Sequence, residues 1–107
     1  MYSDAVDGRP TKIQASNGNV FSDLGFNAEE AQNLKVRSDL MIELTKLIET
    51  SGLTQTAAAK LLGVTQPRIS DLVRGKIDRF SVDSLIEMLG HAGASVSFRV
   101  ELRSRVA

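Results

Sequence analysis

The chain has 107 residues, of which 42% are hydrophobic and 24% charged, and its formal net charge is zero. This length allows one compact domain with tails and disfavours a multi-step enzyme, and no apolar run approaches the roughly 20 residues of a membrane span. The sequence has no cysteine, and its N-terminus lacks a basic start followed by an apolar stretch, so it predicts a cytoplasmic protein without disulfides.

The charges are unevenly divided along the chain. Residues 1–50 carry five basic and eight acidic side chains, a net charge of −3, whereas residues 51–107 carry eight basic and five acidic ones, a net charge of +3. Lysine and arginine supply much of the affinity of a protein for nucleic acid. The asymmetry therefore suggests a separate surface for an anionic partner, with an even scatter of charge over the folded surface as the alternative.

The first twenty residues predict a flexible arm, because they mix glycine, proline and asparagine with little apolar periodicity. We expect the folded domain to cover residues 21–107. A helix is predicted from Asn27, which with Glu30 three residues later resembles a capping box. Its apolar residues recur at spacings of three and four up to Gly52: Leu34, Leu40, Met41, Leu44, Leu47 and Ile48. The pattern leaves open whether residues 33–37 interrupt this helix.

Three shorter helices follow, each preceded by a residue that can cap it. Thr54 begins a helix that ends at Leu62 before Gly63, and Thr65 begins another, with Pro67 in its first turn and Gly75 after its end. Ser81 caps the fourth helix, whose apolar face consists of Val82, Leu85, Ile86 and Leu89.

After Gly93 the period changes to two, which predicts a strand over residues 95–103. Its apolar positions are Val96, Phe98, Val100 and Leu102, and they alternate with Ser97, Arg99, Glu101 and Arg103. A lone strand cannot satisfy its own backbone, so we expect the same strand of a second molecule to pair with it and form a dimer interface. The alternative is pairing within the chain with the short segment Val20–Phe21.

Residues 54–76 meet the requirements of a helix-turn-helix. Ala59 is small where the two helices would cross, and Gly63 can take the positive φ of the turn. Ile69, Leu72 and Val73 would anchor the second helix. On a helical wheel the opposite face consists of Pro67, Ser70, Asp71 and Arg74, flanked by Gln66 and Arg68.

The stretch LTQTAAAKLLGVTQPRISDLVRGK, residues 53–76, resembles the Xre (Cro-type) repressor family, and the order of elements over residues 27–103 resembles its HigA-type antitoxin branch. The resemblance implies a mainly α fold, a lambda-repressor-like helix-turn-helix bundle with a C-terminal β-strand paired across a dimer. It also places Gln66, Arg68, Ser70 and Asp71 on the helix that faces the DNA groove, and Thr54, Gln55 and Thr65 at helix starts beside phosphates.

The chemistry of these side chains agrees with DNA binding. Glutamine can bond adenine, arginine can bond guanine bidentately, and helix N-termini favour phosphate oxygens. The expected base contacts are Gln66, Pro67, Arg68, Ser70 and Asp71, and the expected phosphate contacts are Thr54, Gln55, Thr65, Arg74, Lys76 and Arg79.

Two of these assignments have an alternative. Asp71 could accept a hydrogen bond from cytosine, or it could pair with Arg68 or Arg74 to orient them. Arg74, Lys76 and Arg79 could instead belong to an ordinary solvated surface.

The sequence therefore predicts a repressor that binds double-stranded DNA as a homodimer on a palindromic operator. The alternative is an antitoxin that neutralises a ribonuclease toxin and represses its own operon, and a third reading is a structural interaction module. Neither catalytic residues, a metal site nor a cofactor is expected, since cysteine is absent and His91 is the one histidine. His91, near the end of the fourth helix, either complements the helix dipole or packs.

Overall fold

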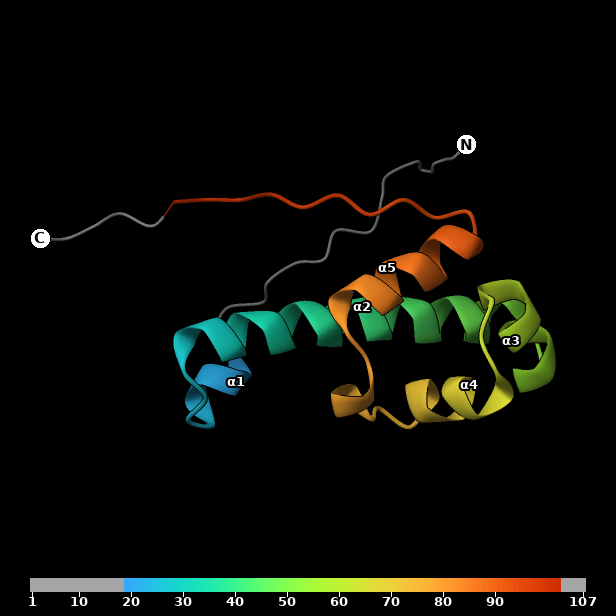
Figure 1. The fold of residues 1–107 in the computed structure, drawn as a ribbon, viewed down its shortest axis with the longest axis horizontal. Coiled ribbons are helices and arrows are strands. Elements are labelled where there is room, and N and C mark those ends of the chain that lie inside the picture. Colours follow the sequence, from blue (N-terminus) through green and yellow to red (C-terminus); the bar gives the residue numbers. More distant parts are fainter. Residues whose placement is uncertain (1–18, 103–107) are drawn as a thin grey trace, which may run out of the picture.

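The computed structural model describes residues 19–102, which form five α-helices and one short 3-10 helix, η1 (Figure 1). The predicted arm lies outside these residues except for Asn19 and Val20, and so does Arg103 at the end of the predicted strand. In chain order the elements are α1 (Val20–Asp23), α2 (Ala28–Ser51), α3 (Gln55–Leu62), α4 (Gln66–Val73), η1 (Ile77–Arg79) and α5 (Val82–His91). No helix within residues 19–102 is long and apolar enough to cross a membrane.

Helix α2 is the axis of the fold, and it begins and ends where the sequence predicts. The side chain of Asn27 accepts a hydrogen bond from the Glu30 amide at 2.8 Å, and Gly52 ends the helix with a φ of +71°. The helix runs without a break through residues 33–37. In Figure 1, α5 lies on one side of α2 and α4 on the other, and both helices contact α2.

Two of the three predicted side-chain caps of the shorter helices are confirmed, whereas Thr65 precedes α4 without a capping hydrogen bond from its side chain. Thr54 Oγ1 accepts from the Ala57 amide at 3.1 Å, and Ser81 and Ser84 form a reciprocal capping box. The helices enclose one core, whose largest fully buried side chains are Leu40, Leu44, Leu62, Ile69, Leu72, Leu85 and Met88. One expected anchor is wrong: Val73 is 38% exposed, because it lies at the side of α4 rather than beneath it.

The N-terminal turn α1 was not predicted. The Asn19 side chain accepts from the Phe21 amide at 2.9 Å and donates to the carbonyl oxygen of Ala31 in α2, also at 2.9 Å. One side chain thus caps α1 and ties it to α2. Because Val20 and Phe21 are helical, the alternative that they pair with the C-terminal segment as a strand is wrong.

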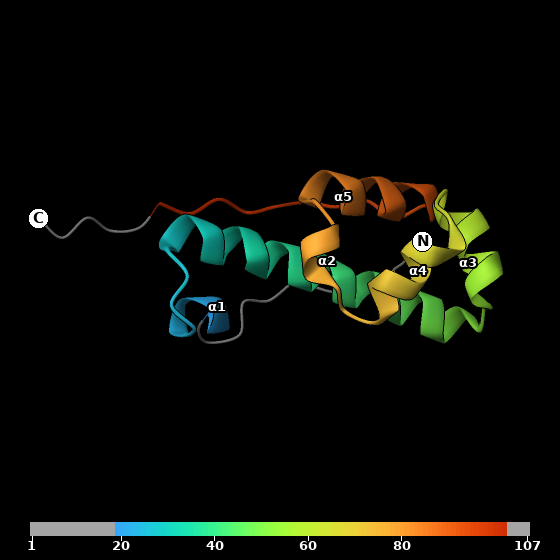
Figure 2. The same ribbon diagram turned by 60° about the horizontal axis from the view of Figure 1, so that its bottom comes forward.

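The C-terminal arm, residues 94–102, extends from the end of α5 back along the direction of α2 (Figure 2). The described residues 19–102 contain no hydrogen-bonded strand. The predicted strand over residues 95–103 is therefore not formed among residues 19–102, since a strand is defined by its pairing and the arm has no neighbouring strand in this part of the chain.

Candidate nucleic-acid interface

Helices α3 and α4 form a tight angled pair. Ala59 and Leu62 on α3 and Ile69 on α4 are buried, so the predicted small residue lies at the helix contact. Gly63 has a φ of +72°, and the amide of Val64 donates to the carbonyl of Ala59 at 3.0 Å. This left-handed glycine lets the chain turn within three residues, and the buried contacts then hold α4 at a fixed angle.

The turn is also supported by α5. A Cβ atom on Gly63 would lie 3.1 Å from two atoms of the His91 ring. His91 is the last residue of α5, and its exposed side chain lies beside this turn.

Apart from Arg68, the residues predicted for the groove-facing side lie on or directly after α4 and are exposed or half-buried. Gln66, Pro67 and Arg74 are exposed, while Ser70 and Asp71 are half-buried. The opposite face carries the buried Ile69 and Leu72. This division into a polar outer face and an apolar inner face is the arrangement with which a recognition helix enters the major groove.

The residues expected beside phosphates lie at two helix starts and after α4. Thr54, Gln55 and Thr65 are exposed at the N-terminal ends of α3 and α4. The cap of α3 uses the Thr54 hydroxyl, whereas the Thr65 hydroxyl makes no capping hydrogen bond within the described chain. Lys76 is half-buried in the connection between α4 and η1.

Arg68 does not extend outward from α4. Its Nη1 donates to the carbonyl oxygen of Arg79 at 2.6 Å, and its guanidinium lies 4.2 Å above the centre of the Phe80 ring. Phe80 is 3% exposed, so the ring is a fixed platform. The arginine therefore joins α4 to the η1 segment in this conformation.

Asp71 pairs with neither of the two arginines considered from the sequence. Its Oδ2 lies 3.3 Å from Nη1 of Arg79, and the two side chains are 17% and 54% exposed respectively. The backbone carbonyl of Arg79 holds Arg68 while its guanidinium holds Asp71. A single residue of η1 thus contacts two side chains of α4.

Arg37 on α2 is a positioning residue that the sequence did not reveal. Its Nη1 donates to the carbonyl oxygens of Ile77 and Phe80, both at 3.1 Å, and its Nε donates to the Asn33 side chain at 2.7 Å. These bonds fix η1 against α2, and η1 in turn holds Arg68. No local pattern indicates such contacts, because 40 residues separate Arg37 from Ile77.

The electrostatic asymmetry coincides with the helix-turn-helix. Residues 54–80 carry five basic and two acidic side chains, a net charge of +3, whereas residues 20–53 carry three basic and six acidic ones, a net charge of −3. Asp71, one of the two acidic residues of this segment, is paired with Arg79, and a net positive charge of this kind favours a polyanion as partner.

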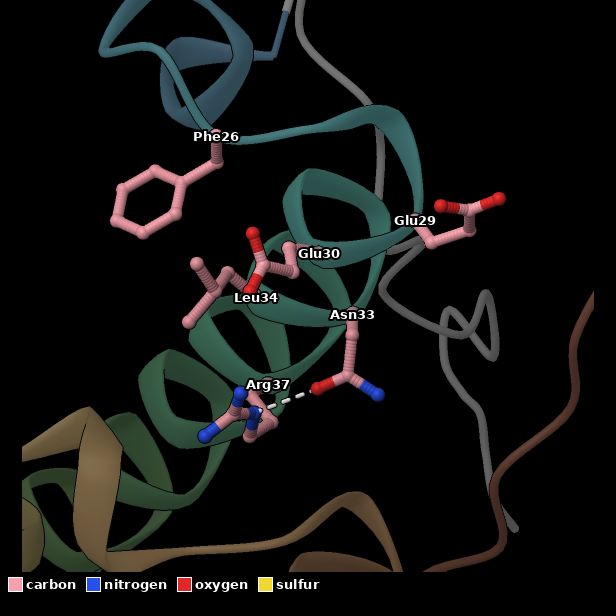
Figure 3. A pocket seen from close by; sticks show the side chains of 6 residues that line it. All are labelled: Phe26, Glu29, Glu30, Asn33, Leu34 and Arg37. Carbon is pink, nitrogen blue, oxygen red and sulfur yellow. Dashed lines mark hydrogen bonds between the residues drawn. The ribbon is translucent and has the colours of Figure 1, made fainter.

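A hollow of about 370 Å³ lies on the N-terminal half of α2 (Figure 3). Phe26 and Leu34 form its apolar side, and Figure 3 shows Arg37 at its edge bonded to Asn33. Because two carboxylates, Glu29 and Glu30, also line it, this hollow is unsuited to a nucleic-acid backbone.

The fold and this surface define a helix-turn-helix domain. The family described as "Helix-turn-helix domain" matches residues 20–101, and no curated protein matches the chain. A solved structure named as a candidate XRE family transcriptional regulator has 34% sequence identity and a TM-score of 0.64, over 73% of this chain and 90% of that one. The chain belongs to the XRE family of helix-turn-helix proteins.

Proposed function

We propose that this protein is a sequence-specific transcriptional repressor that places α4 in the major groove of double-stranded DNA. The observation that carries the proposal is the outward face of α4, where Gln66, Pro67 and Ser70 lie on a helix whose inner face is fully buried. The similarity to a candidate transcriptional regulator supports the same function.

The proposed contacts divide into three groups by geometry. Gln66, Pro67 and Ser70 contact base edges, and Asp71 accepts from a cytosine amino group while Arg79 holds it in place. Arg68 is a positioning residue, because its donors are directed at the η1 carbonyl and Phe80. The phosphate contacts are Thr54, Gln55, Thr65, Arg74, Lys76 and Arg79.

The repressor acts as a dimer through its C-terminal arm. Phe98, Val100 and Leu102 are 54%, 86% and 95% exposed, although they alternate as the apolar face of a strand would. Burying such a side chain stabilises an association by about 1.5–3 kcal/mol. A second copy of the arm offers both the missing backbone partners and an apolar face, so two recognition helices would meet a palindrome.

Selection of bound DNA from a random pool, at a fixed and stated salt concentration, tests the function. We expect enrichment of a palindrome whose half-site centres are about one helical turn apart. The double variant Gln66→Ala/Ser70→Ala, which changes two side chains of the outward face and none of the core, should lose this enrichment while keeping its helical circular dichroism. A wild-type selection without any enriched sequence would contradict sequence-specific binding.

A second candidate function is that of an antitoxin. It is favoured by the acidic segment 20–53 and by three exposed apolar residues at its start: Val20, Leu24 and Phe26. Charge complementarity would then recruit a basic ribonuclease. A neighbouring gene for a small basic toxin, whose purified product this chain inhibits, is expected in that case; a neighbouring product that is unaffected by equimolar protein would contradict it.

A further inference from the structure

The polar side of the C-terminal arm carries a pair of opposite charges that lie close together. Arg99 Nη1 lies 3.3 Å from Glu101 Oε2, and the two side chains are 79% and 72% exposed. They are two residues apart on an extended segment and therefore share one face, opposite to Phe98, Val100 and Leu102. This charge pattern distinguishes between the ways in which two arms can pair.

Two identical strands that pair across a perpendicular two-fold axis run antiparallel, and one residue then lies opposite its own copy. With Arg99 on the axis, two arginines would face each other, and with Glu101 on the axis, two glutamates would. Like charges directly opposite each other destabilise a strand pair, whereas opposite charges contribute about 0.2–1 kcal/mol. The arm's charges therefore disfavour both of these registers.

Three registers centred on an exposed apolar residue of the arm remain, those of Phe98, Val100 and Leu102. With Leu102 on the axis, Glu101 would face Arg103 but Arg99 would face Arg105, which pairs like charges. With Phe98 on the axis, Arg99 would face Ser97 and Glu101 would face Ser95, so neither charge would have a cross-strand partner. With Val100 on the axis, Arg99 faces Glu101 of the partner subunit twice, and Phe98 faces the partner's Leu102 twice. This register alone pairs both charges while matching the most exposed apolar side chains.

We propose that the arm binds a second copy of itself in an antiparallel register with Val100 on the two-fold axis. The inference rests on the proposed dimer but adds which residues meet. The dimer and its register are tested by separate measurements, so a wrong register can be told apart from the absence of a dimer.

Cysteine cross-linking tests the register, because the chain has no cysteine of its own. Directly opposite residues in an antiparallel pair have Cα atoms about 4.5–5.5 Å apart, within the range of a disulfide. We expect Val100→Cys in the full chain to form a covalent dimer under mild oxidation. Phe98→Cys should not, because its two copies would lie four residues, or about 13 Å, apart along the strands.

Mixed proteins provide the matched control: Phe98→Cys and Leu102→Cys should cross-link to each other as a heterodimer. Strong cross-linking of Phe98→Cys with none for Val100→Cys would move the axis and overturn the register while leaving the dimer intact. A wild-type chain that sediments as a monomer at all accessible concentrations would instead overturn the dimer.

A charge-exchange cycle tests the same contacts without new covalent bonds. Arg99→Glu and Glu101→Arg each place like charges opposite one another, and we expect each to raise the dimer dissociation constant about tenfold at low salt. The double variant Arg99→Glu/Glu101→Arg restores opposite charges and should return to within about threefold of the wild type. A double variant that dissociates as readily as either single variant would overturn the register.

Discussion

Arg68 connects α4 to the η1 segment through two groups, the carbonyl of Arg79 and the ring of Phe80, which lie 11 and 12 residues away in the sequence. Its guanidinium lies over Phe80 and bonds Arg79, whose own side chain reaches back to Asp71, and Arg37 holds the backbone on either side. A planar guanidinium can stack and donate at the same time, which an ammonium cannot. The orientation of α4 against η1 therefore depends on this residue being arginine.

Replacing Arg68 with alanine should lower the free energy of unfolding by about 1–2 kcal/mol, since a partly exposed cation–π contact and a charge-assisted hydrogen bond are lost. DNA affinity should fall on all sequences with base preference unchanged. Chemical denaturation and sequencing of a selected DNA pool measure the two effects. Arg74→Ala, the exposed arginine after the same helix, should leave stability within about 0.5 kcal/mol.

The opposite pattern for Arg68→Ala would support direct base reading by this arginine. It would appear as wild-type stability together with relaxed preference at one or two positions of each half-site.

At the scale of elements, the turn between α3 and α4 depends on Gly63, where both the backbone conformation and the neighbouring side chain favour glycine. Gly63 has a positive φ, and a Cβ there would lie only 3.1 Å from the ring of His91 in α5, which is a tight contact. Gly75, which follows α4, has nearly the same φ of +73° but open space around its Cβ position. The two glycines therefore separate the cost of backbone conformation from the cost of packing.

Gly63→Ala should destabilise the protein by about 2 kcal/mol and Gly75→Ala by about 1 kcal/mol, because only the first adds a tight contact to the strain of a left-handed alanine. In a His91→Ala background the two substitutions should cost the same. Thermal and urea unfolding of the six proteins measures this cycle. Equal costs in the wild-type background would show that the ring moves away freely.

On the scale of the whole molecule, the net charge of zero is the sum of segments with opposite charges. The helix-turn-helix segment 54–80 has a net charge of +3 and the segment 20–53 a net charge of −3. Binding of DNA by the first segment releases condensed counterions, so affinity should fall steeply with salt, while the second segment contributes no such dependence.

Lys76→Ala should therefore weaken binding to specific and random DNA alike and reduce the slope of log affinity against log salt by about one. Lys46→Ala is the matched control, because Lys46 is an exposed lysine of α2 that pairs with Glu43 at 3.8 Å. Fluorescence anisotropy over a salt series measures both slopes. A Lys76 variant with the wild-type slope would remove this residue from the phosphate contacts.

Most helix boundaries follow from local chemistry, which is why they could be predicted. Capping residues such as Asn27, Thr54 and Ser81 satisfy amides within three positions, and Gly52 and Gly63 end helices through their own backbone freedom. The buried and outward faces of α4 follow from the same short-range periodicity, apart from Val73 at their border.

The sequence by itself thus determined the order of the four main helices, the helix-turn-helix and the residues of its outward face. Only the tertiary structure decided that α1 is helical, that Arg68 turns toward Phe80, and that Arg37 holds η1. A one-turn helix is unstable alone and forms here with the bond from Asn19 to α2. Arg68 and Arg37 bond carbonyl groups that lie 11 and 43 residues away in the sequence. Such contacts form only once packing has brought these segments together.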